Sequence, residues 1–348
     1  MEVKIFLNNF LSSRYSIVYN LIKQMGVKHF TKFSLLLLLV LFIFASFRYF
    51  YQGDPKGIGT DNFEIIAHRG AHVMWKQGEY DLATGCEATH IYEPTAEQTY
   101  IENTIESIGK AFESGATIVE IDIRPSKDNI LMINHEENLE CKTNGHGKIG
   151  DYTAEDLKKL DIGFGFTYDD GKTYPYRGKG VGKMPTLQEV LEKYPDKQFL
   201  IDHKDRTMKT ANLLVDHLKE LSEKQRKNIY YWGSKEIGDY IKEEIPEINR
   251  LLANRAEMKT CIIKYVSSFG LLGFGEECQG LAVGMTRQYS KYMWGWPINF
   301  IKKAREKNSP VYLVVDTPDD VEWAKNLPVD GIITDHIELV GSEFRQLL

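Results

Sequence analysis

From residue 63 onward, short apolar runs alternate with longer stretches in which apolar residues recur at helical spacing. The runs that fit strands are 63–67, 117–123, 130–134, 198–201, 228–232, 250–253, 280–283, 311–315 and 331–334. The stretches that fit helices are 104–114, 153–160, 187–193, 208–227, 235–244, 299–307 and 318–326. Strands that alternate with helices predict a mostly parallel sheet with right-handed crossovers. About eight such units without a dinucleotide-binding glycine fingerprint favour a closed (β/α)8 barrel, the α/β fold called a TIM barrel, over an open doubly wound sheet.

Two stretches interrupt this alternation, at residues 71–101 and 141–185. Each follows an expected strand end that carries charged residues, and each is rich in aromatic residues. Because the loops at the carboxyl ends of barrel strands surround the active site, we expect both insertions to lie over the mouth of the barrel. Loops in that place usually determine which substrate is accepted.

Before residue 63 the pattern changes to one uninterrupted apolar run. Residues 33–47 carry no charge and include five consecutive leucines, and aromatic residues extend the run to residue 51. Such a run is long enough to cross a membrane, and it lacks the polar face of a core helix. A cleaved signal peptide is the competing interpretation, but the preceding segment is longer than an ordinary n-region and no clear cleavage site follows. We therefore expect an uncleaved, single-pass anchor over 33–51.

The expected order is a basic segment (1–32), the anchor (33–51), a linker (52–62) and the barrel domain (63–348). Residues 1–32 hold five lysines and arginines against one glutamate. By the positive-inside rule this segment stays in the cytoplasm, which places the barrel domain outside it, on the periplasmic side of an inner membrane. A helix at the membrane surface and a solvated tail both fit the segment itself.

Charge and cysteine content narrow the picture only a little. A net charge of -6 and a pI near 5.9 argue against a nucleic-acid-binding surface, so any recognition of phosphate must be local. The four cysteines, Cys86, Cys141, Cys261 and Cys278, show no C-x-x-C or zinc-site spacing. A Cys261–Cys278 disulfide and buried free thiols both fit this pattern.

Glu120 and Asp122 are two residues apart on an expected strand, so their side chains point to the same side of it. Two carboxylates this close do not both stay ionised without a positive charge nearby. Oxygen ligands of this kind suit Mg²⁺ or Ca²⁺ better than zinc. A lysine or arginine that neutralises the pair is the alternative.

Two histidines, His68 and His135, each end an expected strand. A single histidine in such a place is more often structural, but two beside a carboxylate pair suggest acid–base chemistry, because imidazole titrates near neutral pH. Arg69 offers a planar fork that fits a phosphate group. Together with a metal ion, these residues indicate phosphodiester cleavage.

The motifs that carry this chemistry occur in a specific order: His68-Arg69-Gly70, Glu102-Asn103-Thr104, Glu120-Ile121-Asp122, His135, Pro185-Thr186-Leu187 and Asp330-Gly331-Ile332-Ile333-Thr334-Asp335. In this order they resemble the glycerophosphodiester phosphodiesterase family, and the resemblance covers nearly everything from 63 to 340. It implies a TIM barrel that hydrolyses glycerophosphodiesters to sn-glycerol 3-phosphate and an alcohol, with one divalent metal ion, Mg²⁺ or Ca²⁺.

The resemblance also implies a role for each residue. His68 and His135 would be the acid–base pair, and Arg69 would hold the phosphate. The metal ligands would be Glu120, Asp122 and Asp202. Glu102 and Lys204 would lie near the metal and bind substrate. Asp202 departs from the family pattern, which usually has a glutamate there, and the 71–101 insertion is much longer than the family's usual connection.

Two other functions remain open at this level. The same site could accept lysophospholipids in a lysophospholipase D reaction, since an anchor and an enlarged mouth would suit a lipid. A tethered barrel that binds glycerol-phosphate groups without turnover is the non-enzymatic alternative, although binding alone needs no acid–base pair. The aromatic segment 292–297 fits both packing under a loop and contact with a membrane surface.

Overall fold

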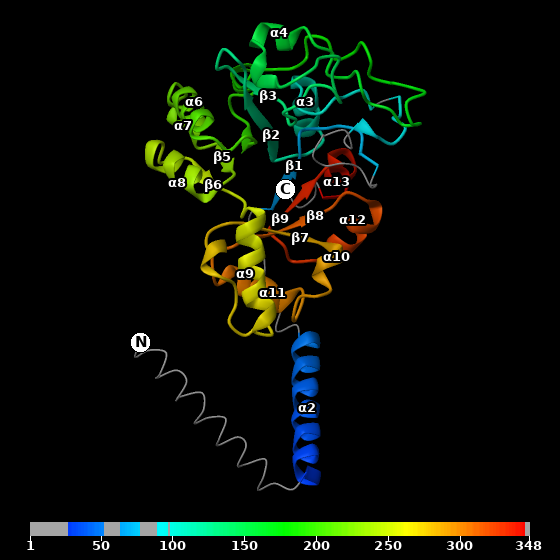
Figure 1. The fold of residues 1–348 in the computed structure, drawn as a ribbon, viewed down its shortest axis with the longest axis vertical. Helices are drawn as coiled ribbons and strands as arrows, with labels where there is room; N and C mark the ends of the chain where they lie inside the picture. Colours follow the sequence, from blue (N-terminus) through cyan, green and yellow to red (C-terminus); the bar gives the residue numbers. More distant parts are fainter. Residues whose placement is uncertain (1–26, 52–62, 77–88, 97, 345–348) are drawn as a thin grey trace, which may run out of the picture.

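The computed structural model describes residues 27–51, 63–76, 89–96 and 98–344, and its centre is a ring of parallel strands (Figure 1). The strands are β1 (Glu64–Ala67), β2 (Ile118–Pro125), β4 (Gln198–His203), β5 (Ile229–Trp232), β6 (Asn249–Arg250), β7 (Val283–Thr286), β8 (Val311–Val314) and β9 (Gly331–Thr334). Neighbours in the order β6-β5-β4-β2-β1-β9-β8-β7 pair in parallel. A parallel bridge between Leu252 and Ala282 joins the two ends of this order. The expected (β/α)8 barrel is confirmed.

Helices cover the outside of the ring. The longer ones are α3 (Ile105–Glu113), α5 (Leu187–Lys193), α6 (Met208–Lys219), α8 (Lys235–Glu244), α9 (Arg255–Ser267), α11 (Ile298–Arg305), α12 (Pro318–Ala324) and α13 (Ile337–Phe344). Their apolar faces and the outward side chains of the strands form the main core. A smaller cluster fills the ring itself: Ile66, Ile118, Leu200, Leu252, Ala282 and Tyr312. Several of these residues lie two positions before a polar residue at the mouth of the barrel. They therefore form the packed floor of the mouth.

The strand expected at 130–134 is present but does not belong to the ring. It is β3 (Leu131–Ile133), which pairs antiparallel with the end of β2. The connection from β2 to β3 is only a turn, whereas a parallel crossover needs a dozen or more residues. The pattern predicted a mostly parallel sheet, and β3 is an antiparallel exception to it. The β2–β3 hairpin returns the chain directly to the mouth of the barrel.

Two other elements differ from the pattern-based expectation. α9 was not predicted, although Met258, Cys261, Ile262, Tyr265 and Val266 recur at helical spacing and lie in or against the core. The single helix expected over 208–227 is two helices, α6 and α7 (Glu223–Arg226). Ser222 caps α7 with its side chain, and this starts a new helix.

The described parts of the two insertions pack on one another above the ring, at the upper end in Figure 1 with the short helix α4 (Ala154–Lys158). Bridges pair Trp75 with Ile91 inside the first insertion, and His90 of the first with Thr167 of the second. Val73, Ile91 and Phe166 share a small apolar core of their own. The insertions therefore form one unit on the barrel.

Below the barrel in Figure 1 stands α2 (Val27–Phe50). Its segment Thr31–Phe50 has 20 residues and a mean hydropathy of 2.2, and none of it is buried. By length and composition it could cross a membrane or serve as a signal sequence. Most of the basic segment expected at 1–32 and all of the linker expected at 52–62 lie outside the described residues.

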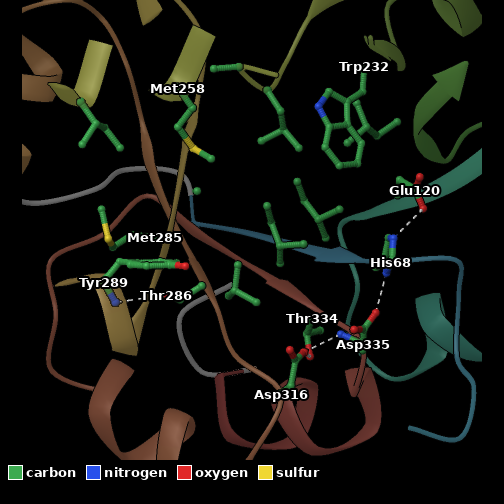
Figure 2. Close-up of a pocket in the computed structure, with 18 of the residues that line it drawn as sticks. His68, Glu120, Trp232, Met258, Met285, Thr286, Tyr289, Asp316, Thr334 and Asp335 are labelled. Atoms are coloured by element: carbon green, nitrogen blue, oxygen red, sulfur yellow. Dashed lines mark hydrogen bonds and ion pairs between the residues drawn. The ribbon is translucent and has the colours of Figure 1, made fainter. Parts of the chain in front are cut away.

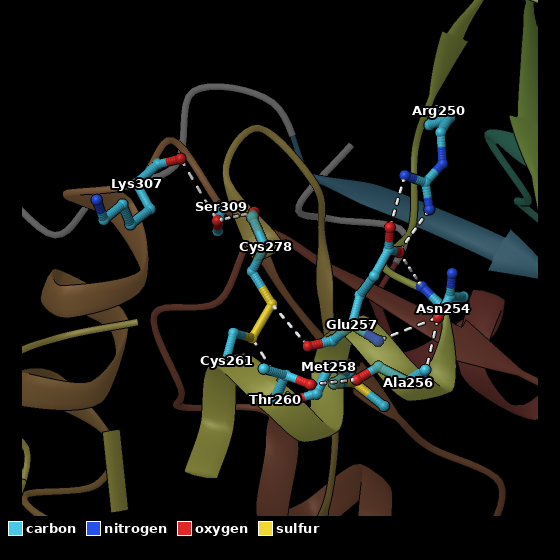
Figure 3. Close-up of a disulfide and its surroundings, with 10 residues drawn as sticks. All are labelled: Arg250, Asn254, Ala256, Glu257, Met258, Thr260, Cys261, Cys278, Lys307 and Ser309. Atoms are coloured by element: carbon cyan, nitrogen blue, oxygen red, sulfur yellow. Dashed lines mark hydrogen bonds and ion pairs between the residues drawn. A yellow bond between two sulfur atoms is a disulfide. The ribbon is translucent and has the colours of Figure 1, made fainter. Parts of the chain in front are cut away.

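A disulfide between Cys261 and Cys278 joins α9 to the 3-10 turn η3 (Glu276–Cys278), as Figure 3 shows. Cys141 is disulfide-bonded as well, and no described cysteine is a free thiol. Of the two alternatives that the sequence left open for Cys261 and Cys278, the structure has the bridge.

We expect the double variant Cys261→Ala with Cys278→Ala to lower the free energy of unfolding by roughly 2–4 kcal/mol, because a closed loop of this length restricts the unfolded chain. Thermal melting of the purified protein measures this. Both sulfur atoms belong to buried residues, so alanine keeps the site apolar. An unchanged melting temperature would contradict a stabilising role for the bridge.

Candidate active site

The turn after β1 directs His68 and Arg69 into the mouth of the barrel. Its backbone is in the left-handed region, with φ of 59° at Arg69 and 82° at Gly70. A Cβ atom at Gly70 would lie 2.6 Å from Ser107 Oγ and 2.9 Å from the Ser107 backbone carbon. Only glycine fits there, which explains the His-Arg-Gly motif in terms of geometry.

Three carboxylates meet inside the mouth, as predicted. Glu120 and Asp122 lie on β2, and the strand register places Asp122 beside Asp202 on β4. One oxygen from each of the three lies within 4.8 Å of the others, and all three residues are buried. Asn103 Nδ2 donates to Asp122 Oδ2 at 2.7 Å, and the Arg69 backbone N–H donates to Glu120 Oε2 at 3.1 Å.

Positive side chains neutralise part of this acidic cluster. Lys204 Nζ lies 2.8 Å from Asp122 Oδ1 and 2.6 Å from Asp202 Oδ2, and Arg69 Nε lies 3.3 Å from Asp122 Oδ2. Glu120 Oε1 and Asp202 Oδ1 are nevertheless buried without a hydrogen-bond partner. Burial, together with repulsion from Asp122, raises the pKa of Glu120 to about 8. The oxygen set therefore still has room for a hard divalent cation.

His68 is held between two carboxylates. Its Nδ1 lies 2.5 Å from Asp335 Oδ1, and its Nε2 lies 3.9 Å from Glu120 Oε2 (Figure 2). Burial by itself would lower the pKa of His68, but the two carboxylates outweigh it and raise the pKa to about 9. Asp335 directly follows β9, the ring neighbour of β1, and this adjacency explains why the two residues meet.

His135 follows β3 and lies close enough to Asp122 for that carboxylate to act on its pKa. Its Nδ1 lies 2.9 Å from Glu136 Oε1, and its backbone carbonyl accepts a hydrogen bond from Arg124 Nε at 2.7 Å. Burial lowers the pKa of His135, although the negative charge of Asp122 opposes this effect. The environments of the two histidines thus move their pKa values in opposite directions.

A second buried network holds Arg69. Glu102 Oε1 lies 3.0 Å from Arg69 Nη1 and 2.6 Å from Lys142 Nζ, and Lys142 also lies 2.9 Å from Glu136 Oε1. The Trp75 ring covers Arg69, with 4.8 Å from the guanidinium carbon to the ring centre. Trp75 belongs to the first insertion and Lys142 to the second, so both insertions help to hold the arginine.

A cavity of about 480 Å³ extends from this site into the barrel (Figure 2). His68, Glu120 and Asp335 form its polar end. Elsewhere the lining is mostly apolar and includes Trp232, Met258, Met285 and Tyr289, with Gly284 leaving space on β7. Such a cavity can hold an apolar group next to the reacting one.

The glycerophosphoryl diester phosphodiesterase family has a sequence model that matches residues 85–339, well over half of the chain. The chain belongs to this family. The match begins after His68, so the position of His68-Arg69-Gly70 in the site is a separate observation that agrees with the family assignment.

Curated members of the glycerophosphoryl diester phosphodiesterase family match over shorter segments. A glycerophosphodiester phosphodiesterase from Caldanaerobacter subterraneus subsp. tengcongensis is 39% identical over 101 residues, which cover 29% of this chain and 38% of that protein. Human "Lysophospholipase D GDPD1" is 28% identical over 139 residues, which cover 38% of this chain and 41% of that protein. The matched segments thus span less than half the length of these relatives.

Solved structures of the family share the fold. The glycerophosphodiester phosphodiesterase from Agrobacterium tumefaciens has a TM-score of 0.53 at 21% identity and covers 80% of this chain and 99% of its own. A phosphodiesterase from Oleispira antarctica, solved in complex with the product sn-glycerol-3-phosphate, has a TM-score of 0.53 at 19% identity and covers 81% of this chain and 96% of its own.

The structure brings the residues expected from the family resemblance to one place, with one adjustment. For Glu102 the link to the three carboxylates is indirect: it contacts Arg69 and Lys142, and Arg69 in turn contacts Asp122. Sequence reasoning assigned no role to Asn103, Glu136, Lys142 or Asp335. Asn103 and Asp335 lie within family motifs, which could have singled them out. For Lys142, inside an insertion, the sequence offers no signal.

Asp316 lies in the cavity beside Asp335. It accepts a hydrogen bond from the backbone N–H of Asp335 at 2.7 Å. Burial and repulsion from Asp335 raise the pKa of Asp316 to about 6. A carboxyl group whose pKa is higher in the folded than in the unfolded protein destabilises the fold as the pH rises from the unfolded pKa to the folded pKa. We therefore expect Asp316→Asn to gain thermal stability relative to wild type between about pH 4 and 6. A stability difference that does not change with pH would contradict this.

Proposed function

We propose that this protein hydrolyses glycerophosphodiesters to sn-glycerol 3-phosphate and an alcohol. The observation that carries the proposal is the pair of histidines beside three buried carboxylates, one with a raised pKa and one with a lowered pKa. Environments that move two titratable groups in opposite directions are typical of an acid and a base that work together. Membership of the glycerophosphoryl diester phosphodiesterase family supports the same reaction.

Glu120, Asp122 and Asp202 would hold one divalent cation, and their oxygen-only set suits Mg²⁺ or Ca²⁺. When bound, the cation would supply positive charge for the phosphate and for the charge that develops during the reaction. Arg69 offers its guanidinium to the same phosphate, since Glu102 and Trp75 hold it at the mouth.

His135 is the neutral partner and would take the proton from the glycerol hydroxyl that attacks phosphorus. His68 is protonated at neutral pH and would give a proton to the departing alcohol oxygen. The bond from phosphorus to that oxygen breaks as the new one forms, which leaves a cyclic glycerol phosphate. Water then opens the ring, with His68 as base and His135 as acid.

The direct test is release of sn-glycerol 3-phosphate from glycerophosphocholine and glycerophosphoethanolamine by the full-length protein in detergent. Mg²⁺, Ca²⁺ or a chelator would be added in parallel. Release that depends on the cation supports the proposal. If folded protein, shown by a normal melting transition, releases no sn-glycerol 3-phosphate with either cation, the proposal is wrong. The non-catalytic binding function would then replace it.

A specific observation favours lysophospholipids as a second substrate class. The apolar cavity begins at His68 and extends away from the polar mouth, and its volume of about 480 Å³ gives room for part of an acyl chain. Human "Lysophospholipase D GDPD1" is among the relatives. A chain placed in this cavity would bring its glycerol phosphate close to the two histidines.

Gly284 provides a sharp test of this second substrate class. A Cβ atom there meets no neighbour within 4 Å, so a larger side chain can enter the cavity without a backbone clash. We expect Gly284→Leu to reduce hydrolysis of lysophosphatidylcholine by about tenfold or more. Hydrolysis of glycerophosphocholine, which has no chain to place there, should change much less. Equal losses on the two substrates would contradict an acyl site, and Gly284→Ala serves as the matched control.

We further propose a single membrane pass by α2, with the barrel outside the cytoplasm. The Cys261–Cys278 disulfide supports this placement, because disulfides persist in oxidising compartments. The basic residues before α2 support it through the positive-inside rule. The test is to fuse, after Leu348, a reporter that is active only in the cytoplasm. Activity of this fusion would show that the topology is the reverse of the one proposed.

A further inference from the structure

The loop that follows α9, residues 268–273, lies alongside α2. Arg48 of α2 donates through Nε to the carbonyl of Phe269 at 3.1 Å and through Nη2 to the carbonyl of Gly270 at 3.3 Å. The ring of Phe44 lies 5.9 Å from the ring of Phe269. The barrel therefore contacts the side of α2 as well as its end.

A second segment of the barrel holds the last turn of α2. The hydroxyl of Tyr49 donates to the carbonyl of Lys291 at 2.7 Å, and the Gly295 N–H donates to the carbonyl of Tyr49 at 3.3 Å. The Tyr49 ring also lies 6.1 Å from Trp294, which in turn lies 5.0 Å from Phe269. These contacts link both segments to the helix and to each other.

The position of Phe44 along α2 sets the depth of the loop. The segment Thr31–Phe50 has 20 residues and is therefore about 30 Å long, which matches the hydrocarbon thickness of a bilayer. Phe44 lies about 9 Å before the end of that segment, at 1.5 Å per residue. With α2 across the membrane, Phe44 and the Phe269 ring beside it lie about 9 Å on the acyl-chain side of the boundary between headgroups and acyl chains. Interfacial elements bury their apolar side chains to this depth.

The exposed surface of the loop has the composition that this depth requires. Leu271 and Leu272 are 53% and 69% exposed, and Tyr292 of the second segment is 60% exposed. Lys264, which precedes the loop in the chain, and Lys291, which precedes Tyr292, are exposed as well. Tyrosine and lysine around apolar residues suit the headgroup layer, where lysines meet anionic lipids.

We propose that the loop 268–273 inserts into the interface of the bilayer that α2 spans, where headgroups meet acyl chains, so that the barrel rests directly on the lipid surface. This inference depends on the proposed membrane span, and it does not depend on turnover of any substrate. Tyr289 lines the cavity, is 58% exposed, and lies two residues before Lys291. The exposed side of the cavity is thus close to the lipid, from which an acylated substrate would come.

The test uses the full-length variant Leu272→Cys in vesicles of phosphatidylcholine and phosphatidylglycerol, labelled with the fluorophore NBD. The described cysteines are disulfide-bonded, so the introduced thiol takes the label. Val181→Cys is the matched control, because Val181 is 57% exposed and belongs to the second insertion, at the other end of the molecule from α2. We expect blue-shifted emission and quenching by doxyl-labelled lipid at 272, and neither at 181.

A second position, Leu271→Cys, guards against a local effect of one substitution. Equal, water-like emission at 271, 272 and 181 would overturn the proposal. Because fluorescence needs no catalysis, a protein that hydrolyses neither glycerophosphocholine nor lysophosphatidylcholine would refute the proposed function and leave this result intact. Vesicles without phosphatidylglycerol should reduce the quenching at 272 if the lysines contribute.

Discussion

His68→Ala is expected to reduce the hydrolysis of glycerophosphocholine by a factor of about 10²–10⁴, the usual contribution of a general acid. The carboxylate of Asp335 raises the pKa of this histidine, to about 9. The loss should be much smaller with the p-nitrophenyl ester of glycerol phosphate, whose leaving group needs no proton. Single-turnover release of the leaving alcohol from the two substrates provides the comparison, because His68 also acts in the later ring-opening step.

His135→Ala is the matched control for this experiment. As the proposed base, His135 acts on the attacking hydroxyl, so its loss should reduce the rate on both substrates alike. If the nitrophenyl ester rescues His135→Ala and not His68→Ala, the acid and the base have been assigned the wrong way round. A wild-type rate in His68→Ala would remove His68 from the mechanism altogether.

Glu120→Gln should abolish the stabilisation of the protein by Mg²⁺ or Ca²⁺. A cation at a hundredfold excess over its Kd would stabilise the wild-type fold by about 2.7 kcal/mol, and the variant loses one of the three buried carboxylates proposed to hold it. Without a cation, the raised pKa of Glu120, about 8, makes wild type less stable as pH rises from about 4.5 toward 8. Glutamine does not ionise, so this loss of stability with rising pH should be absent from the variant.

Thermal melting with and without the cation measures both effects of Glu120→Gln without any substrate. Asp316→Asn is the control, since Asp316 lines the same cavity but does not belong to the carboxylate cluster. It should keep the full shift with the cation. A cation shift that persists in Glu120→Gln would place the metal elsewhere.

The barrel and its carboxylates could be predicted from the sequence because both depend on local periodicity. Alternating strands and helices imply parallel pairing, and a spacing of two implies a shared face for Glu120 and Asp122. The register that places Asp202 beside Asp122 is a property of strand pairing, which no single strand encodes. Only the family resemblance singled out Asp202.

The remaining differences come from contacts between segments far apart in the chain. α9 has apolar residues on more than one side: Cys261 is buried and bonded to Cys278 of η3, while Ile263 is 54% exposed. Lys142 reaches Glu102 and Glu136 from within an insertion whose fold depends on packing against the other insertion. Local patterns carry no information about such pairs.

The ring closes most weakly between β6 and β7. β6 has only two residues, and two backbone hydrogen bonds, from Ala253 N to Ala282 O and from Ala282 N to Leu251 O, join the seam. Leu252 and Ala253 of this seam line the cavity, whereas His68 directly follows β1 and the three carboxylates lie on β2 and β4. β2 and β4 pair over six residues. Substitutions at the seam can therefore change the shape of the cavity while His68 and the three carboxylates keep their positions. Selection can change substrate preference in this barrel without first rebuilding its chemistry.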